Sequence, residues 1–155
     1  SRGLEPFQRD YMKKLMAYLL HQDFDSIEKM TAEYKDSITN KKWELAKFAK
    51  TETLQESPEN YRKKIDSGKG RRSAAYQLAL NSDRQYGQGD QISYYDTGIK
   101  KKVSVVENST LLKEAPAQRD ENTTYYRGKL DDLYAKFADF LPKNEEDDNP
   151  LGLEF

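Results

Sequence analysis

The sequence of 155 residues contains no cysteine and a single histidine, His21. Without cysteine the chain has no disulfide framework, no thiolate metal site and no Cys nucleophile, and this absence suits a reducing compartment. His21 stands beside Gln22 and Asp23, with no second histidine to complete a catalytic or metal-binding pair. No apolar run approaches the roughly 20 residues that cross a bilayer, and the first residues lack the apolar stretch of a signal peptide. We therefore expect a soluble, cytoplasmic protein without a membrane partner.

Aliphatic residues are also scarce. The hydrophobic fraction is 35% and the charged fraction 34%, yet the chain has eleven Tyr, six Phe and one Trp. A disordered chain is poor in aromatic residues, so this composition indicates a folded protein. At this length roughly two-thirds of the unfolded surface is buried on folding. The sequence predicts one small, aromatic-rich core under a heavily charged surface.

The net charge of -1 conceals a segregation of charge along the chain. All 26 Lys and Arg residues and 22 of the 27 acidic residues precede residue 145, so the body carries +4 and the last eleven residues carry -5. Between Lys41 and Arg72, ten basic residues face five acidic ones. A local basic excess of this kind suits a polyanionic partner, although an ordinary solvated surface has the same composition.

Two helices are predicted in the first forty residues. Apolar side chains recur at three- and four-residue steps over residues 7–20, and Pro6 suits the first turn of this helix. Asp25 and Glu28 form a capping-box pattern that predicts a second helix running to about Ile38. We expect the two helices to pack as a hairpin.

The middle of the chain alternates between short helices and strands. Residues 42–48 fit the helical and the strand period equally poorly, and we favour an extended segment. Ser57 followed by Pro58 predicts the start of a short helix that leads into a basic cluster, and the glycines of residues 67–70 end it. Residues 72–86 predict a further helix.

The last third is predicted to contain a β-hairpin and a helix. Alternating Ile, Tyr and Val residues over 91–107 indicate the hairpin, with its turn at residues 96–98. A helix capped near Asp120 or Asn122 is predicted to run to Leu141. The fold class that follows is α+β, mostly helical, with one antiparallel β-hairpin and a flexible acidic C-terminal tail.

The order of these pieces resembles the thumb region of family B DNA polymerases, the bacterial DNA polymerase II type especially. The motifs that carry the resemblance are Gly3-Leu4-Glu5, Phe7-Gln8-Arg9, Thr51-Glu52-Thr53-Leu54, Tyr61 in a basic helix, Ala74-Ala75-Tyr76-Gln77-Leu78-Ala79, Gly89-Asp90-Gln91-Ile92-Ser93-Tyr94-Tyr95, and Asp120 followed by Tyr125-Tyr126. The strand motif beginning at Gly89 is the most specific. The resemblance implies a thumb domain over residues 1–142, with residues 1–6 a remnant of the palm junction, and a tail over 143–155.

The sequence departs from the family in three places. An Arg-Arg-Asp segment is missing between Glu5 and Pro6, and no Pro-His precedes the Ala-rich helix. The metal-binding aspartate motifs of the palm are also absent, so the chain contains no catalytic residue of its own. The resemblance implies that the chain is part of a DNA-directed DNA polymerase, a nucleotidyltransferase that would use Mg²⁺, while we expect no cofactor and no metal in this chain.

The resemblance also implies a site. A thumb grips duplex primer-template DNA by its phosphates and sugars, next to the palm and the other polymerase domains, in DNA replication or repair at the nucleoid. The residues expected to contact the DNA backbone are Lys50, Thr51, Thr53, Arg62, Lys63, Lys64, Lys69, Arg71 and Arg72. For any one of them, an ordinary surface role is the alternative.

The tail suggests a second partner. Leu151, Leu153 and Phe155 resemble the spaced apolar residues of the peptides that bind bacterial sliding clamps, with Pro150 in the place of the usual Gln. A generic apolar terminus is the alternative for so short a pattern. For the whole chain, the alternative function is a non-enzymatic protein–protein interaction or assembly domain whose basic segments are only solvated.

Overall fold

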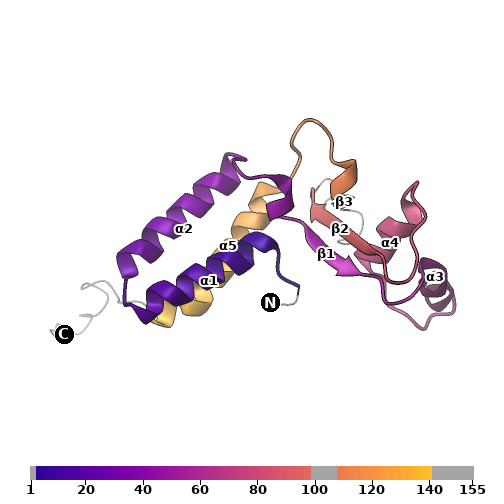
Figure 1. Cartoon of the computed structure of the whole chain (residues 1–155), viewed down its shortest axis with the longest axis horizontal. Coiled ribbons are helices and arrows are strands. Elements are labelled where there is room, and N and C mark those ends of the chain that lie inside the picture. The colour runs from indigo at the N-terminus through magenta and orange to yellow at the C-terminus, as the bar shows by residue number, and fades with distance from the viewer. Residues whose placement is uncertain (1–2, 99–107, 141–155) are drawn as a thin grey trace.

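The computed structural model describes residues 3–98 and 108–140. The fold is α+β and mostly helical, as expected, and its elements form two lobes (Figure 1). The helical lobe consists of α1 (Pro6–Leu20), α2 (Phe24–Thr39) and α5 (Thr123–Phe137). The sheet lobe consists of β1 (Lys50–Thr53), β2 (Gln91–Asp96), β3 (Ser109–Leu111), α3 (Pro58–Asp66) and α4 (Ala74–Asn81). Short 3-10 turns lie at Leu45–Lys47, Leu112–Glu114 and Ala138–Phe140.

The helical lobe confirms the predicted pairing of the first two helices and adds α5 to it. Both α1 and α2 contact α5, which returns from the far end of the sequence. Pro6 begins α1, as predicted. The start of α2 differs from the prediction, because Asp23 rather than Asp25 is the capping residue and accepts the backbone N–H of Ser26 at 3.2 Å. Asp25 instead lies in the first turn, where a negative charge suits the helix dipole.

The sheet has three antiparallel strands in the order β1-β2-β3, so the prediction of a single hairpin was incomplete. The residue pair Lys50 and Tyr94 lies in register between β1 and β2, and Tyr94 and Leu111 between β2 and β3. The predicted return strand of the hairpin falls mostly within residues 99–107, outside the described residues. Sequence patterns missed the sheet pairing of β1 because three of its four residues are exposed and polar, which removes the alternation of a half-buried strand.

Two further predictions in the middle of the chain were wrong. Residues 42–48 do not form an extended segment, because a 3-10 turn at Leu45–Lys47 brings Phe48 into the core beside Trp43, at 5.9 Å between ring centroids. The helix predicted over residues 72–86 is only the eight residues of α4. Its end at Ser82 has a local cause: the Ser82 hydroxyl accepts the backbone N–H of Arg84, a side-chain bond that competes with the helix.

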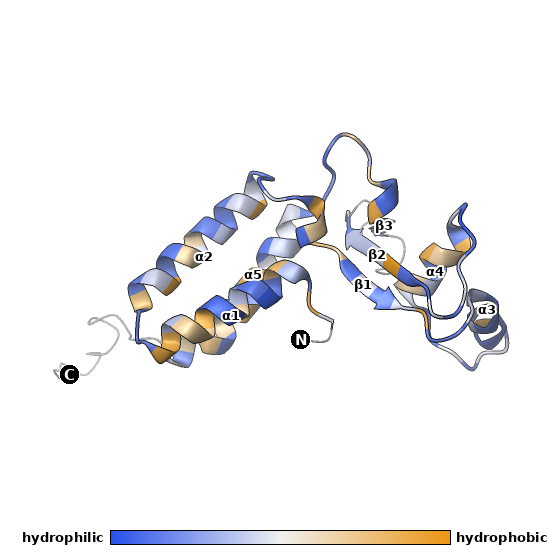
Figure 2. Cartoon of the chain, viewed as in Figure 1, coloured by the Kyte–Doolittle hydropathy of each residue, from blue (hydrophilic) through white to orange (hydrophobic). Residues whose placement is uncertain are grey.

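Two clusters of buried side chains form the cores of the two lobes. Figure 2 shows β1 in blue and an orange stretch on β2, so the apolar residues of these two strands lie on β2. Tyr94 belongs to the cluster under α4 and Tyr95 to the cluster of the helical lobe, because successive strand residues point to opposite faces. Phe48 and Tyr126 stack at 4.5 Å between ring centroids where the lobes meet. The sheet is thereby positioned on the helices by aromatic contacts.

Candidate nucleic-acid interface

Strand β1 presents three of the predicted DNA-binding residues at the free edge of the sheet. Thr51 and Thr53 are exposed and Lys50 is half-buried. The register places Thr51 opposite Ser93, and their hydroxyl oxygens are 2.7 Å apart. Helix α4 covers the other face of the sheet, where it packs on Ile92. The threonines therefore form part of an open, hydroxyl-bearing face.

A polar cleft of about 630 Å³ follows this free edge. It separates β1 from the start of α1, and Arg9 lies on its α1 side, where its guanidinium donates a hydrogen bond to the backbone oxygen of Leu4 at 2.8 Å. The side chain of Glu52 also lines the cleft and accepts a hydrogen bond from Tyr94. Sequence reasoning did not place Arg9 in the site, and its motif Phe7-Gln8-Arg9 was the only signal that could have done so.

The remaining six predicted residues lie on α3 and on the turn that follows it. Ser57 caps α3 by accepting the backbone N–H of Asn60 at 3.1 Å, and Pro58 takes the first helical position, as predicted. At the other end Gly68 adopts a φ of 75°, which only glycine adopts readily, and the chain reverses. The backbone N–H of Lys69 then bonds back to the carbonyl of Lys64 at 2.9 Å. This turn folds residues 69–72 against the end of the helix.

The result is a segment of eleven residues, 62–72, with six basic side chains and one acid, Asp66. All six basic side chains are exposed: Arg62, Lys63, Lys64, Lys69, Arg71 and Arg72. We call these six residues the cationic turn. Lys64 pairs with Glu56 at 2.9 Å and Arg62 approaches Glu59 at 3.7 Å, so part of the charge is balanced locally. Exposed pairs of this kind are weak, and they leave the cations free to exchange partners.

Two stacked tyrosines hold the cationic turn on the sheet lobe. The rings of Tyr61 and Tyr76 lie 4.8 Å apart at an angle of 12°. The Tyr61 hydroxyl accepts hydrogen bonds from the backbone of Ser73 and the side chain of Gln77, both at 2.9 Å. The Tyr76 hydroxyl accepts the backbone N–H of Gln55 at 2.9 Å. Both tyrosines stand in the motifs of the sequence resemblance, but their stacking could not be predicted from the sequence because it joins α3 to α4.

Two acids, the buried Glu5 and the half-buried Asp96, lie behind the β1 edge, where the two lobes meet. Burial raises the pKa of the Glu5 carboxyl above its ordinary value, and nearby Lys50 offsets this only in part. Burial likewise raises the pKa of Asp96, although a hydrogen bond from the Asn122 amide at 2.9 Å acts in the opposite direction and lowers it in part. Burial and the hydrogen bond to Glu52 raise the pKa of the Tyr94 phenol, so it stays protonated at neutral pH. Lys50 is half-buried beside these acids, whereas every other cation of the predicted set is exposed.

Other predicted residues lie outside the described part of the chain. Leu151, Leu153 and Phe155 fall within residues 141–155, so the clamp prediction stays a prediction. Within residues 3–98 and 108–140, no group of three or more His, Cys, Asp or Glu side chains is arranged to hold a metal ion. None of the helices in that same part is both long and apolar enough to span a membrane.

The structure thus brings the predicted DNA-binding residues together in one lobe but in two groups. Lys50, Thr51 and Thr53 lie along the sheet edge, and the six others form the cationic turn, joined to that edge through residues 54–57. The grouping depends on the tyrosine pair and on Gly68, which are tertiary and turn features. Contact of these nine residues with DNA stays a prediction.

Comparison with known proteins gives a similarity of fold. No protein-family model matches the sequence, and no curated protein matches it either. Among solved structures, the chain is similar to the family B DNA polymerase from the hyperthermophilic archaeon Pyrobaculum calidifontis, with a TM-score of 0.56 and 18% sequence identity. The similarity covers 78% of this chain and 15% of that chain. At this identity the similarity is one of fold: the chain folds like a part of that family B DNA polymerase.

Proposed function

We propose that this chain is the thumb region of a family B DNA polymerase, of the bacterial DNA polymerase II type, and that it grips duplex primer-template DNA. Two independent lines support the proposal: the order of sequence motifs, and the fold shared with a part of an archaeal family B polymerase. The single observation that carries DNA gripping is the cationic turn, six exposed basic side chains within eleven residues.

The grip works through the DNA backbone. Lysine and arginine neutralise phosphates regardless of sequence, which a polymerase needs because the duplex must advance after every nucleotide. The hydroxyls of Thr51 and Thr53 on the open edge of β1 position a strand by hydrogen bonds to phosphate oxygens. The Tyr61 and Tyr76 pair keeps the cationic turn in place relative to that edge. In this proposal catalysis, with Mg²⁺, belongs to a palm that the chain does not contain.

We propose in addition that Leu151, Leu153 and Phe155 bind a sliding clamp. The support is the sequence pattern: three apolar residues at alternate positions after an acidic run. A peptide in extended conformation places alternate side chains on the same side, where they enter a common pocket. The two sites together would hold the product duplex and tether it to the clamp.

A different function has one observation in its favour. Met16 and Leu20, on α1 at the end of the helical lobe away from the sheet, are 47% and 81% exposed. Exposed apolar side chains grouped on one surface favour a protein–protein interaction or assembly domain. This alternative predicts no dependence of binding on DNA.

Fluorescence anisotropy with a labelled primer-template duplex tests the DNA grip. The variant Lys63→Ala/Lys69→Ala/Arg71→Ala removes three cations that have no ion pair among the described residues. We expect its affinity at low salt to fall by about tenfold, and the slope of log K against log salt concentration to lose about 3, since each phosphate contact contributes about 0.9 to that slope. The loss is expected to be the same for duplexes of different sequence.

The matched control is Lys13→Ala/Lys29→Ala/Lys136→Ala, which removes the same charge from exposed positions of the helical lobe. We expect its affinity and its salt slope to stay close to those of the parent chain. Equal losses of DNA affinity in the two triple variants would show that affinity depends only on the net charge of the chain, and would reject the cationic turn as a DNA-binding site. Absence of any binding by the parent chain at low salt would defeat the proposal for the chain on its own.

A further inference from the structure

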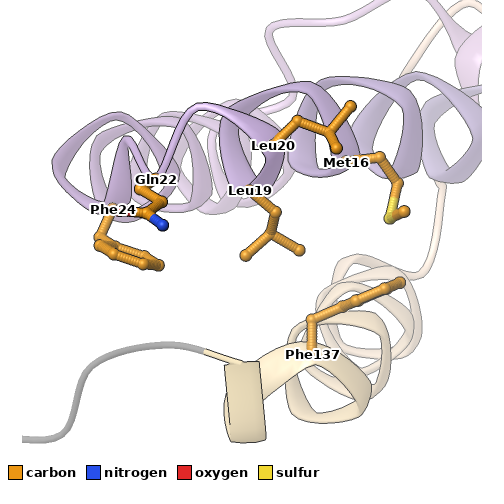
Figure 3. A pocket seen from close by; sticks show the side chains of 6 residues that line it. All are labelled: Met16, Leu19, Leu20, Gln22, Phe24 and Phe137. Atoms are coloured by element: carbon orange, nitrogen blue, oxygen red, sulfur yellow. The ribbon is translucent and has the colours of Figure 1, made fainter.

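An apolar groove of about 360 Å³ lies at the end of the helical lobe away from the sheet (Figure 1), and Figure 3 shows the side chains that line it. Its lining comes from the end of α1, the start of α2 and the end of α5, and consists of Met16, Leu19, Leu20, Gln22, Phe24 and Phe137. Figure 3 shows Leu19 and Phe24 pointing toward the side on which Phe137 lies. The volume falls within the range of ordinary ligand pockets, about 300–1,000 Å³.

The groove is uncovered by the described residues. Leu20 is 81% exposed and Met16 47% exposed, and these are the most exposed large apolar side chains in that part of the chain. Gln22 supplies a polar group on the rim, and its φ of 55° is uncommon for a residue other than glycine. An apolar lining with a single carboxamide suits an extended peptide, because apolar side chains fill the groove while the amide bonds to the peptide backbone.

We propose that this groove is the docking site of the chain's own C-terminal segment, residues 151–155. Fifteen residues follow the last described one, Phe140, which is only three residues beyond the groove residue Phe137. From Phe140 to Leu151 the chain spans up to ~36 Å when extended. The groove lies close to the start of that span, so the segment reaches it without strain.

The chemistry of the segment fits the groove. Leu151, Leu153 and Phe155 stand at alternate positions with small or polar residues between them. In extended conformation their side chains project to one side and can enter the apolar lining together. The short connection gives an effective concentration on the order of mM, so that a weak contact suffices for docking.

A second copy of the chain fits the groove less well. A stable dimer interface takes about 20–30 residues from each partner, and the groove offers six lining residues. A short peptide of the same chain needs no larger area, because the covalent link removes most of the entropy cost of association. The docking does not rest on DNA binding or on a clamp. If residues 151–155 also bind a clamp, the docked state withholds them from it.

Methyl NMR of the full chain tests the docking directly. The chain has three methionines, Met12, Met16 and Met30, and only Met16 lines the groove. Replacing Leu151, Leu153 and Phe155 by alanine is expected to move the Met16 methyl resonance and leave that of buried Met30 in place. An unchanged Met16 resonance would overturn the proposal. A Met16 shift that depends on protein concentration would also overturn it, in favour of a second copy.

A competition measurement uses a fluorescein-labelled peptide of residues 149–155. We expect it to bind the alanine-tail variant about tenfold more tightly than the parent chain, whose own tail competes for the groove. Adding Leu20→Glu to the alanine-tail variant should abolish binding. The matched control is Ala17→Glu, which places the same charge on an exposed α1 position outside the lining and should leave binding intact. Equal effects of the two glutamates would refute the groove as the site. Neither readout involves DNA.

Discussion

At the scale of single residues, Glu5 combines features that rarely occur together. It is 2% exposed, precedes α1 as its capping residue, and its Oε2 atom has no hydrogen-bond partner among the described residues. Its backbone N–H donates to the Gln8 side chain at 3.0 Å. A buried carboxylate with one unsatisfied oxygen is costly when charged, which is why its pKa is raised. The residue therefore makes folding depend on pH.

The direction of that dependence follows from the raised pKa. The folded state keeps the Glu5 proton at pH values where the unfolded state has already released it. The contribution of Glu5 to the free energy of unfolding therefore falls as pH rises from its ordinary pKa of about 4.5 to its raised pKa in the folded state. We expect Glu5→Gln to remove this loss of stability. The free energy of unfolding, measured by urea denaturation, should increase for the variant relative to the parent chain as pH rises from 4 to 7.5.

The control is Glu33→Gln, an exposed position on α2. We expect a nearly constant difference from the parent chain across the same pH range. Asp96 has a raised pKa as well and is present in all three proteins, and its charge is one of the causes that raise the pKa of Glu5, so the difference measured for Glu5→Gln includes this coupling. A Glu5→Gln difference that shrinks toward neutral pH would contradict the assigned direction.

At the scale of elements, the start of α5 depends on one side-chain amide. Asn122 caps the helix by accepting the backbone N–H of Tyr125 at 3.1 Å, and its Nδ2 donates to Asp96 at the end of β2. Gly98 lies against this amide with a φ of 61°, and a Cβ there would stand 2.3 Å from Asn122 Nδ2. The cap, the strand end and the glycine form one unit that joins the sheet to the helix.

Two glycine substitutions should therefore have opposite effects on stability. Gly98→Ala forces a left-handed backbone on alanine and displaces the Asn122 cap, so we expect a loss of about 2–3 kcal/mol. Gly128→Ala, within α5, meets no atom within 4 Å and should stabilise the helix by about 0.5–1 kcal/mol. Thermal and urea denaturation of both variants measure the difference. Stabilisation by Gly98→Ala would show that the Asn122 contact does not restrict this position.

At the scale of the whole molecule, the two lobes meet at an aromatic junction. Phe48 and Tyr126 stack there, and the Tyr126 hydroxyl accepts the backbone N–H of Asp96 at 2.6 Å. Phe48 is followed within two residues by β1, so the stacked pair also sets where the strand edge begins. The open face of the sheet and the apolar groove lie on different lobes. The residues proposed to grip DNA therefore share no side chain with the groove or with the proposed clamp-binding peptide, and we expect DNA binding and clamp binding to be separable by mutation.

Independence of the two functions can be measured in one pair of variants. A chain lacking residues 150–155 should lose retention on a purified bacterial sliding clamp while keeping its affinity for primer-template DNA. The variant Lys63→Ala/Lys69→Ala/Arg71→Ala should behave in the opposite way. Pull-down on the clamp and anisotropy with DNA give the two readouts. Clamp retention that survives removal of the six residues would reject the tail as the clamp-binding peptide.

The sequence by itself determined the elements with strong local signals. Pro6 and the Ser57–Pro58 pair begin α1 and α3 as predicted, because capping and the fixed φ of proline act within one turn. The basic cluster on α3 and its following turn could also be identified, since charge is visible without a fold. The α+β class followed from the helical periods and the Tyr-rich strand.

Only the tertiary structure decided how these pieces meet. The pairing of β1 with β2, the packing of α5 on α1 and α2, and the stacking of Tyr61 on Tyr76 join residues far apart in the sequence. The Phe48 turn and the short α4 were mispredicted for the same reason: burial in a shared aromatic core and side-chain bonds to neighbouring backbone outweigh weak local preferences. The sheet edge, the polar cleft and the apolar groove exist because of those contacts, and no local pattern contains them.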